Sequence, residues 1–237
     1  MKQPGYLKYL KLKKLQETYG HGKNKRVLVV DTGYCKLDDK DPVISLECPI
    51  PDGKGGIDIS TKKHGTGVAS VIKAICPKAT IYTVRCESKD PKLKSYWHAE
   101  ALDRARYSNI KFDVINMSFA WDSNDPNLYA MIRWFYLAGS KLVAAAGNKA
   151  GRYFYPANYL EVTSVGCMYW KDGKPYSGNA LGYTILAPGT GVETRVGTLS
   201  YTSMAAPVVS AMFALGMSEY QICKWIGSCK PLGEKKK

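Results

Sequence analysis

The stretch Thr202-Ser203-Met204-Ala205-Ala206-Pro207 leads directly into an apolar run, Val208-Val209-Ser210-Ala211-Met212-Phe213-Ala214-Leu215. The run is long enough for a buried helix, and the two hydroxyl residues ahead of it are typical of a helix N-terminus. A serine there faces unpaired backbone N–H groups and the positive end of the helix dipole, which suits an oxyanion that forms beside it. Because Ser203 could equally be an ordinary capping residue, the remaining motifs have to decide between these interpretations.

Apolar runs of strand length alternate with helical patterns along the rest of the chain. The expected strands, each an apolar run of four or five residues, are 27–30, 80–84, 114–118, 142–146, 162–165 and 183–187. The expected helices are 64–75, 95–108, 127–138 and 203–215. Residues 34–63, rich in Asp, Pro, Gly and Lys, are expected to form a surface loop. Strands separated by helices predict an α/β fold with three layers, α/β/α, around a mainly parallel central sheet.

Positive charge is concentrated at the two ends of the chain. The formal net charge is +14, of which residues 1–26 contribute +7 and residues 230–237 contribute +3. We therefore expect a basic N-terminal extension over residues 1–25, one domain over residues 26–229, and a basic tail after it. A basic amphipathic helix within residues 1–20 is expected to pack on the domain surface. No nucleic-acid-binding motif is present, so the charge of the two ends predicts no more than nonspecific contact with nucleic acid.

Cysteine usage and hydropathy bear on location. The seven cysteines form no CxxC pair and no regular framework, so reduced thiols in a reducing compartment are expected. The N-terminus lacks the apolar block of a secretory signal, and no run of about 18 apolar residues is present. We expect a cytoplasmic monomer without membrane contact, with an already processed secreted form as the alternative.

An acidic turn is the one candidate for a metal site. Asp38, Asp39 and Asp41 could ligate a cation through their carboxylates. We interpret the turn as solvated, and the three histidines do not lie at zinc-finger spacing from the cysteines. No metal and no cofactor is therefore expected.

Three further polar residues end a strand or open a helix. Asp31 ends the first buried strand, where open α/β sheets place ligand and catalytic groups. His64 opens a helix beside two glycines, and Asn148 follows a buried strand, where its side-chain amide could donate to an anion. Each residue has a structural alternative: an aspartate that caps its own turn, a structural histidine, and an asparagine that tolerates left-handed backbone.

Taken in order along the chain, these motifs resemble the subtilisin-like serine proteases, or subtilases. The four motifs that carry the resemblance are Val29-Val30-Asp31-Thr32-Gly33, His64-Gly65-Thr66-Gly67-Val68-Ala69, Ala144-Ala145-Ala146-Gly147-Asn148 and Thr202-Ser203-Met204-Ala205-Ala206-Pro207. Asn116-Met117-Ser118 also resembles the substrate-binding strand of that family. The likeness extends from about residue 26 to residue 215, and it implies the subtilisin-like form of the predicted fold.

The resemblance implies a role for each polar residue in peptide-bond hydrolysis. Ser203 Oγ would attack the scissile carbonyl, and His64 would take its proton and return it to the leaving amine. Asp31 would fix the imidazole tautomer and stabilise the imidazolium. Asn148 and the backbone N–H of Ser203 would form the oxyanion hole.

A polypeptide substrate is implied by the same likeness. Ser118, Phe119 and Ala120 would pair with its extended backbone by β-augmentation. The other residues expected to line the binding site are Ala145, Gly147, Lys149 and Phe154. Because the loop after Asn148 is short and carries Lys149, Arg152 and Phe154, the hypothesis is a shallow, cationic pocket for small or acidic side chains.

Two departures from the family pattern leave alternatives open. Tyr201 stands where subtilases usually have glycine, so that its ring would press on the leaving-group side or require a different turn. Ala120 stands where the substrate strand usually ends in glycine. A catalytically inactive subtilase fold that binds peptides or a partner is therefore the alternative to a serine endopeptidase. A serine esterase would use the same site, and a nucleic-acid-binding protein would depend on the basic ends alone.

Overall fold

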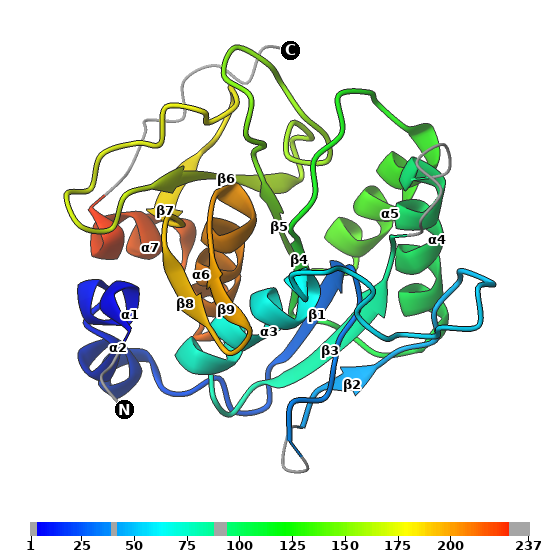
Figure 1. Ribbon diagram of the computed structural model, residues 1–237, viewed down its shortest axis with the longest axis horizontal. Helices are drawn as coiled ribbons and strands as arrows, with labels where there is room; N and C mark the ends of the chain where they lie inside the picture. The colour runs from blue at the N-terminus through cyan, green and yellow to red at the C-terminus, as the bar shows by residue number, and fades with distance from the viewer. Residues whose placement is uncertain (1–3, 39–41, 88–93, 228–237) are drawn as a thin grey trace.

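The structure, a computed structural model, describes residues 4–38, 42–87 and 94–227. At its centre is a parallel sheet of seven strands (Figure 1). In sheet order the strands are β2 (Ile44–Ser45), β3 (Thr80–Arg85), β1 (Arg26–Asp31), β4 (Val114–Met117), β5 (Lys141–Ala145), β6 (Val162–Met168) and β7 (Ile185–Pro188). The predicted mainly parallel sheet is confirmed.

Helices cover both faces of this sheet (Figure 1). On one face lie α3 (His64–Ile75) and α6 (Thr202–Ala214), and on the other lie α4 (Lys94–Tyr107) and α5 (Pro126–Leu137). Side chains of β1 alternate between the two cores: Val27 and Val29 pack with α3 and α6, whereas Leu28 and Val30 pack with α4 and α5. Strand β1 is thus buried on both sides, as its continuous apolar sequence indicates. The three-layer α/β/α prediction is confirmed.

The basic N-terminal segment forms two helices, where the sequence predicted one. These are α1 (Gly5–Tyr9) and α2 (Leu12–Tyr19), and the chain turns between them at Lys11, whose φ of 51° is left-handed and cannot continue a helix. As expected, they pack on the domain surface. Their buried side chains are Tyr6, Leu7, Leu10 and Leu15.

The end of α1 is also hydrogen-bonded to the last described helix, α7 (Glu219–Ile226). Trp225 Nε1 donates to Leu10 O at 2.8 Å, and Tyr9 Oη donates to Ile226 O at 2.9 Å. The two ends of the described chain therefore lie together, with α1 next to β8 and α7 next to β7 (Figure 1). The boundary at residue 25 remains a prediction, and the basic tail 230–237 lies outside the described residues.

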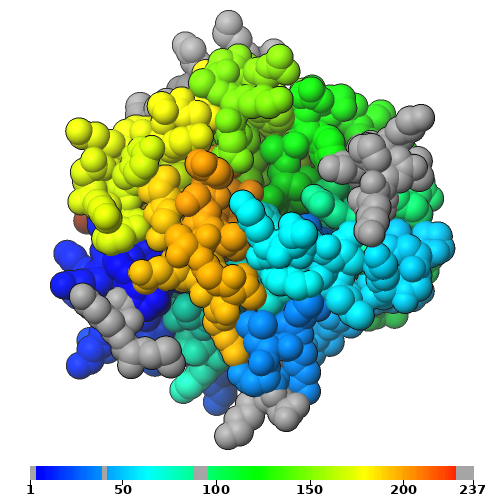
Figure 2. Space-filling view, viewed as in Figure 1, coloured from blue at the N-terminus to red at the C-terminus, as the bar shows by residue number. Residues whose placement is uncertain are grey.

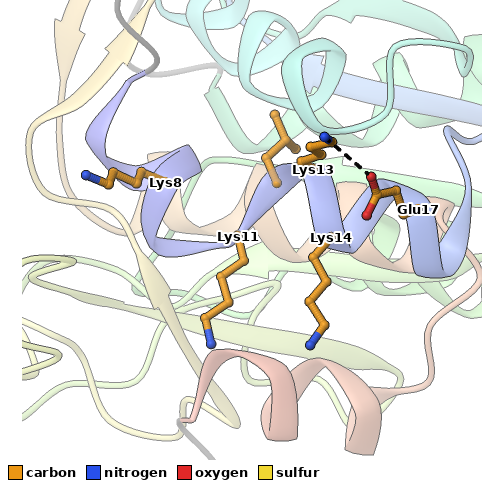
Figure 3. A pocket seen from close by; sticks show the side chains of 6 residues that line it. Lys8, Lys11, Lys13, Lys14 and Glu17 are labelled. Atoms are coloured by element: carbon orange, nitrogen blue, oxygen red, sulfur yellow. Dashed lines mark ion pairs between the residues drawn. The ribbon is translucent and has the colours of Figure 1, made fainter.

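A shallow basic depression of about 370 Å³ lies on these N-terminal helices. Its lining residues are Lys8, Lys11, Leu12, Lys13, Lys14 and Glu17. Lys11 and Lys14 extend side by side, whereas Lys13 points away from them toward Glu17 (Figure 3). The Lys13–Glu17 pair is exposed and 3.9 Å long, so it neutralises little of the local charge.

Three parts of the fold differ from the sequence-based expectation. The segment 34–63 is not wholly a surface loop, because it contributes β2 and the fully buried Asp58. A hairpin of β8 (Val192–Thr194) and β9 (Gly197–Leu199) precedes α6, and α7 follows it. The strands β2, β8 and β9 were not predicted because two or three residues give too short a pattern to detect. No described helix is long and apolar enough to cross a membrane.

Candidate active site

The candidate residues converge at the carboxyl edge of the sheet. Asp31 ends β1, Ser118 follows β4 directly, and Asn148 follows β5. Because β1, β4 and β5 are neighbours in the sheet, parallel pairing brings these three ends to one edge. The N-terminus of α6 reaches the same place, and in Figure 2 the orange chain near residue 200 lies against the cyan chain on this face.

Asp31 and His64 form the closest pair in the site. His64 Nδ1 lies 2.7 Å from Asp31 Oδ1, and the side chains are 29% and 4% exposed. The backbone N–H of Thr32 donates to the same carboxylate oxygen at 2.7 Å. Gly65 permits this approach, because a Cβ there would lie 2.3 Å from the carbonyl oxygen of Gly33 and 3.1 Å from Asp31 Cβ.

The environment of His64 favours its charged form. Burial by itself lowers the pKa of the imidazole, but the charge and hydrogen bond of Asp31, with smaller contributions from the charges of Glu87 and Asp58, outweigh burial and raise that pKa from 6.5 to about 9. The folded-state pKa therefore lies above the unfolded value. Protonated His64 consequently stabilises the fold fully below about pH 6.5, and this contribution is lost as the pH rises through about 9.

Ser203 is the second residue of α6, and α6 packs directly against α3, the helix that His64 opens. Within the described chain, neither its hydroxyl nor its backbone N–H is engaged in a hydrogen bond. The side chain is half-buried and lines a pocket. Both groups are thus available to a substrate. A hydrogen bond from Ser203 Oγ to His64 is not formed among these residues, which is common before substrate binds.

The carbonyl of Ser203 is bonded outside its own helix, and Pro207 is the reason. In a regular helix the N–H of residue 207 would donate to this carbonyl, but proline has no N–H. Ser118 Oγ donates to Ser203 O instead, at 2.8 Å. The substrate-binding segment and the helix of the candidate nucleophile are therefore joined directly.

A buried chain of side chains extends this link into α6. Ser210 Oγ donates to Asn116 Oδ1 at 2.9 Å, and Asn116 Nδ2 donates to Ser118 Oγ at 3.0 Å. Ser118 in turn donates to Ser203 O. Because Asn116, Ser118 and Ser210 are buried, an unpaired member among them would be costly, so the chain fixes the depth of Ser203 relative to β4.

Asn148 is held on the other side of the same helix start. Its Oδ1 accepts hydrogen bonds from the backbone N–H and the hydroxyl of Thr202, at 3.1 and 2.9 Å. This leaves the Nδ2 group of Asn148 as a donor without a partner in the described part of the chain. The Ser203 N–H and Asn148 Nδ2 are the two donors that an oxyanion beside Ser203 would need.

Tyr201 adopts the backbone conformation that glycine would. Its φ of 83° and ψ of −168° lie in a region populated essentially by glycine, at a cost on the order of 1–3 kcal/mol for other residues. Its ring lies 5.0 Å from that of Tyr176, and the side chain is 47% exposed. The turn before Ser203 is therefore kept, and the ring stacks on its neighbour.

A pocket of about 410 Å³ opens beside Ser203. It contains every substrate-binding residue predicted from the sequence, together with Trp121 and Asp122, which the sequence analysis missed. The lining residues are Ser118, Phe119, Ala120, Trp121, Asp122, Ala145, Gly147, Asn148, Lys149, Phe154, Thr202 and Ser203. Trp121 and Asp122 directly continue the segment 118–120, and that adjacency was the available signal.

The floor and charge of this pocket can be assigned to particular residues. The Phe154 ring lies on Gly147, whose φ is 103° and where a Cβ would be 2.6 Å from the ring, so the ring takes up the space above Gly147. Lys149 and Asp122 both line it, and Arg152 lies 4.0 Å from Asp122. Its charge is therefore mixed, which differs from the cationic lining that the sequence predicted, because Asp122 comes from a separate segment.

The two walls of the pocket are joined by backbone pairing. Trp121 N–H donates to Tyr155 O at 2.8 Å, and Tyr155 N–H donates to Trp121 O at 2.7 Å. By contrast, the backbone groups of 118–120 make no backbone hydrogen bond within the part of the chain that the structure describes. This short segment is thus a free edge beside Ser203, suited to pairing with an extended chain.

No group of three metal-ligating side chains occurs among residues 4–38, 42–87 and 94–227. Asp38 of the acidic turn forms an ion pair with Arg195 at 2.5 Å. Asp39 and Asp41 lie outside the described residues.

The six described cysteines, which exclude Cys229, are free thiols.

Comparison with known families fits this geometry. The model of the subtilase family matches residues 15–227. The chain belongs to the subtilase family. The match spans all of the motif residues and extends beyond the limits inferred from the motifs.

Several characterised subtilases resemble the chain over most of its length. Subtilisin DY of Bacillus licheniformis is 27% identical, over 89% of this chain and 83% of the relative. The major intracellular serine protease of Bacillus subtilis (strain 168) is 29% identical, over 90% and 74%. The thermostable alkaline protease of Halalkalibacterium halodurans is 31% identical, over 84% and 58%. The family and these relatives place the chain among the subtilisin-like serine endopeptidases.

Proposed function

We propose that the chain is a monomeric endopeptidase that cleaves polypeptides through an Asp31–His64–Ser203 triad and an acyl-enzyme intermediate. The observation that carries this proposal is the 2.7 Å hydrogen bond between Asp31 and His64. It is supported by the uncommitted hydroxyl of Ser203 at the start of α6, beside a pocket and next to Asn148.

Acylation begins with an extended substrate paired to the backbone of 118–120. Ser203 Oγ attacks the scissile carbonyl carbon while its proton passes to Nε2 of neutral His64. The new imidazolium is stabilised by the Asp31 carboxylate at Nδ1. The Ser203 N–H and Asn148 Nδ2 bind the oxyanion, and His64 then protonates the leaving amine as the C–N bond breaks.

Deacylation repeats these steps with water. His64 takes a proton from the water, which attacks the ester carbonyl of acylated Ser203. As the C–Oγ bond then breaks, His64 returns the proton to Ser203 Oγ, which restores the free hydroxyl and releases the new carboxyl end of the product. Because the base has to be neutral and its pKa is raised to about 9, the reaction is favoured at alkaline pH.

Substitutions at Ser203 and Asn148 test the proposal. Ser203→Ala should abolish hydrolysis of a denatured protein substrate, because the other hydroxyls that line the pocket, those of Ser118 and Thr202, already donate to Ser203 O and Asn148 Oδ1. Asn148→Ala should lower kcat by about 10²–10³-fold with KM nearly unchanged, the loss found in subtilisin when one oxyanion donor is removed. Steady-state kinetics on the folded variants would measure both effects.

The other outcomes of that experiment identify the alternatives. No hydrolysis by the folded native chain would contradict the proposal and favour an inactive fold that binds peptides, with Tyr201 beside the nucleophile. Hydrolysis of short esters but not of peptides would indicate a serine esterase. Lys111→Ala, on an exposed residue at the amino edge of the sheet, serves as the control and should leave kcat unchanged.

We also propose that Phe154 limits the residue before the cleaved bond to a small side chain. The ring occupies the space above Gly147 that a large substrate side chain would need. The mixed charge of Lys149 and Asp122 gives a weaker basis for selecting acidic residues.

Phe154→Ala should therefore widen the preference at the residue before the cleaved bond from small side chains to side chains that include Phe and Leu. We expect kcat/KM for substrates with Phe before the cut to rise about 10-fold relative to Ala, since one pocket contact changes selectivity by about 10–200-fold. A peptide library would measure this, with Lys149→Ala as the control that alters charge but not depth. Equal cleavage after Ala, Leu and Phe by the native chain would contradict it.

The basic depression is proposed to give the chain its nonspecific contact with polyanions. Lys11→Glu/Lys14→Glu should lower the salt dependence of binding to a single-stranded oligonucleotide by about one unit of slope for each lysine that contacts phosphate. Fluorescence anisotropy at several salt concentrations would measure this salt dependence.

Lys111→Glu/Lys141→Glu is the control, because it makes the same change of charge at exposed sites elsewhere. An equal loss of salt dependence in that control would contradict a local site. Charge reversal is preferable to truncation, which would expose the side chains that α1 and α2 bury.

A further inference from the structure

Helix α3 begins without a cap of its own. Its N-cap residue is Lys63, which has a φ of 50° and whose side chain accepts no hydrogen bond from the helix. The backbone N–H groups of a first turn have no partners within the helix, so acceptors have to come from elsewhere. This is the turn that carries His64.

Three side chains from outside the helix supply these acceptors. Ser60 Oγ accepts from His64 N–H at 2.7 Å, and Thr32 Oγ1 accepts from Gly65 N–H at 2.9 Å. The third N–H, that of Thr66, donates to Asp58 Oδ2 at 2.9 Å. The start of α3 is therefore held by a loop residue, by the residue after Asp31, and by a carboxylate.

Asp58 is also bonded to the other two acceptors. Its Oδ1 accepts from Thr32 Oγ1 at 2.8 Å, from Ser60 Oγ at 2.8 Å and from Ser60 N–H at 3.1 Å. Its Oδ2 accepts from the hydroxyl of Thr66 at 2.7 Å in addition to the backbone N–H. One carboxylate thus receives five hydrogen bonds from three residues that surround the Asp31–His64 pair.

Because Asp58 is buried, its carboxylate depends on all of these hydrogen bonds. Asp58 is 0% exposed, and its carboxylate forms no ion pair within the described chain; Lys63 Nζ donates to its backbone carbonyl instead. A buried carboxylate needs its lone pairs occupied, and five neutral donors provide that here. The donors are thereby fixed in direction, because rotation of either the Ser60 or the Thr32 hydroxyl would leave the carboxylate short of a donor.

We propose that Asp58 is a positioning residue that sets the placement of His64 against Asp31. Through Thr32 it is bonded to the end of β1, and through Ser60 and Thr66 it is bonded to the first turn of α3. It touches no reacting atom, and it acts by fixing the backbone of both members of the pair. This inference rests on the proposed function, which it extends beyond the residues of the recognised motifs.

Asp58→Asn is the direct test. The amide replaces one acceptor oxygen by a donor group among five donors, so His64 should lose its alignment. We expect kcat on a peptide substrate to fall by about 10²-fold, the loss typical of a misplacement near 1 Å. KM should change little, because the pocket is built on β4, β5 and α6.

A matched control and a second variant keep the test sharp. Asp113→Asn also removes a partly buried carboxylate, one that pairs with Lys25 and Arg26 N–H at the amino end of β1, and should leave kcat unchanged. Should Asp58→Asn not fold, Ser60→Ala keeps the carboxylate but removes the two hydrogen bonds that the Ser60 hydroxyl forms with Asp58 and with His64 N–H, and it should lower kcat about 10-fold. Ser60→Thr keeps the hydroxyl and should restore it, which a purely structural role for the loop does not predict.

Hydrogen exchange separates this inference from the proposed function. In the native chain the amides of residues 64–66 should exchange slowly, and Asp58→Asn should speed their exchange at least 10-fold while Asp113→Asn does not. This readout stands even where the native chain hydrolyses no peptide, an outcome that would contradict only the proposed function. A folded Asp58→Asn protein with native kcat, or with native protection of 64–66, would overturn the role of Asp58.

Discussion

The hydrogen bond between a nearly buried carboxylate, Asp31, and the imidazole of His64 is the constraint on which the rest of the site depends. It joins residues 33 positions apart in sequence, one at the end of a strand and one at the start of a helix. Burial alone would favour neutral imidazole, and the adjacent charge reverses that preference. The loop 34–63 and the close approach at Gly65 bring the two groups together. A basic histidine at the start of α3, the helix that packs against the helix of Ser203, is the chemical result.

The N-termini of α3 and α6, on the two sides of the site, are capped in the same way. Neither Lys63 nor Tyr201, the N-cap residues of α3 and α6, caps its helix with its side chain. Side chains from neighbouring segments form hydrogen bonds with the backbone groups instead. Asp58 and its partners do so at α3, and Asn148 and Ser118 do so at α6. Every such bond also ties a strand end or a loop to a helix that carries a catalytic candidate. The capping requirement of two helices thus becomes the means of aligning the site.

Sequence reasoning predicted the sheet, the layers and the residues that line the site, because strand-length apolar runs and local motifs carry that information. It did not predict the burial of Asp58, since an aspartate in a Gly- and Lys-rich segment resembles a solvated loop residue until its five donors are known. For the same reason, the sequence does not reveal that Ser118 Oγ donates to Ser203 O in place of the N–H that Pro207 lacks. Asp122 enters the pocket from a different segment than Lys149, so the charge of that pocket depends on contacts that spacing does not reveal.

The most direct measurement of this account is the titration of the His64 ring by NMR, with His21 and His98 assigned by substitution. The account predicts a midpoint near pH 9 in the native chain. In Asp31→Asn, where burial persists and only the smaller contributions of Glu87 and Asp58 still raise the pKa, we expect a clearly lower midpoint. A native midpoint at or below 6.5, or one that Asp31→Asn leaves in place, would contradict the claim that Asp31 holds and charges this histidine.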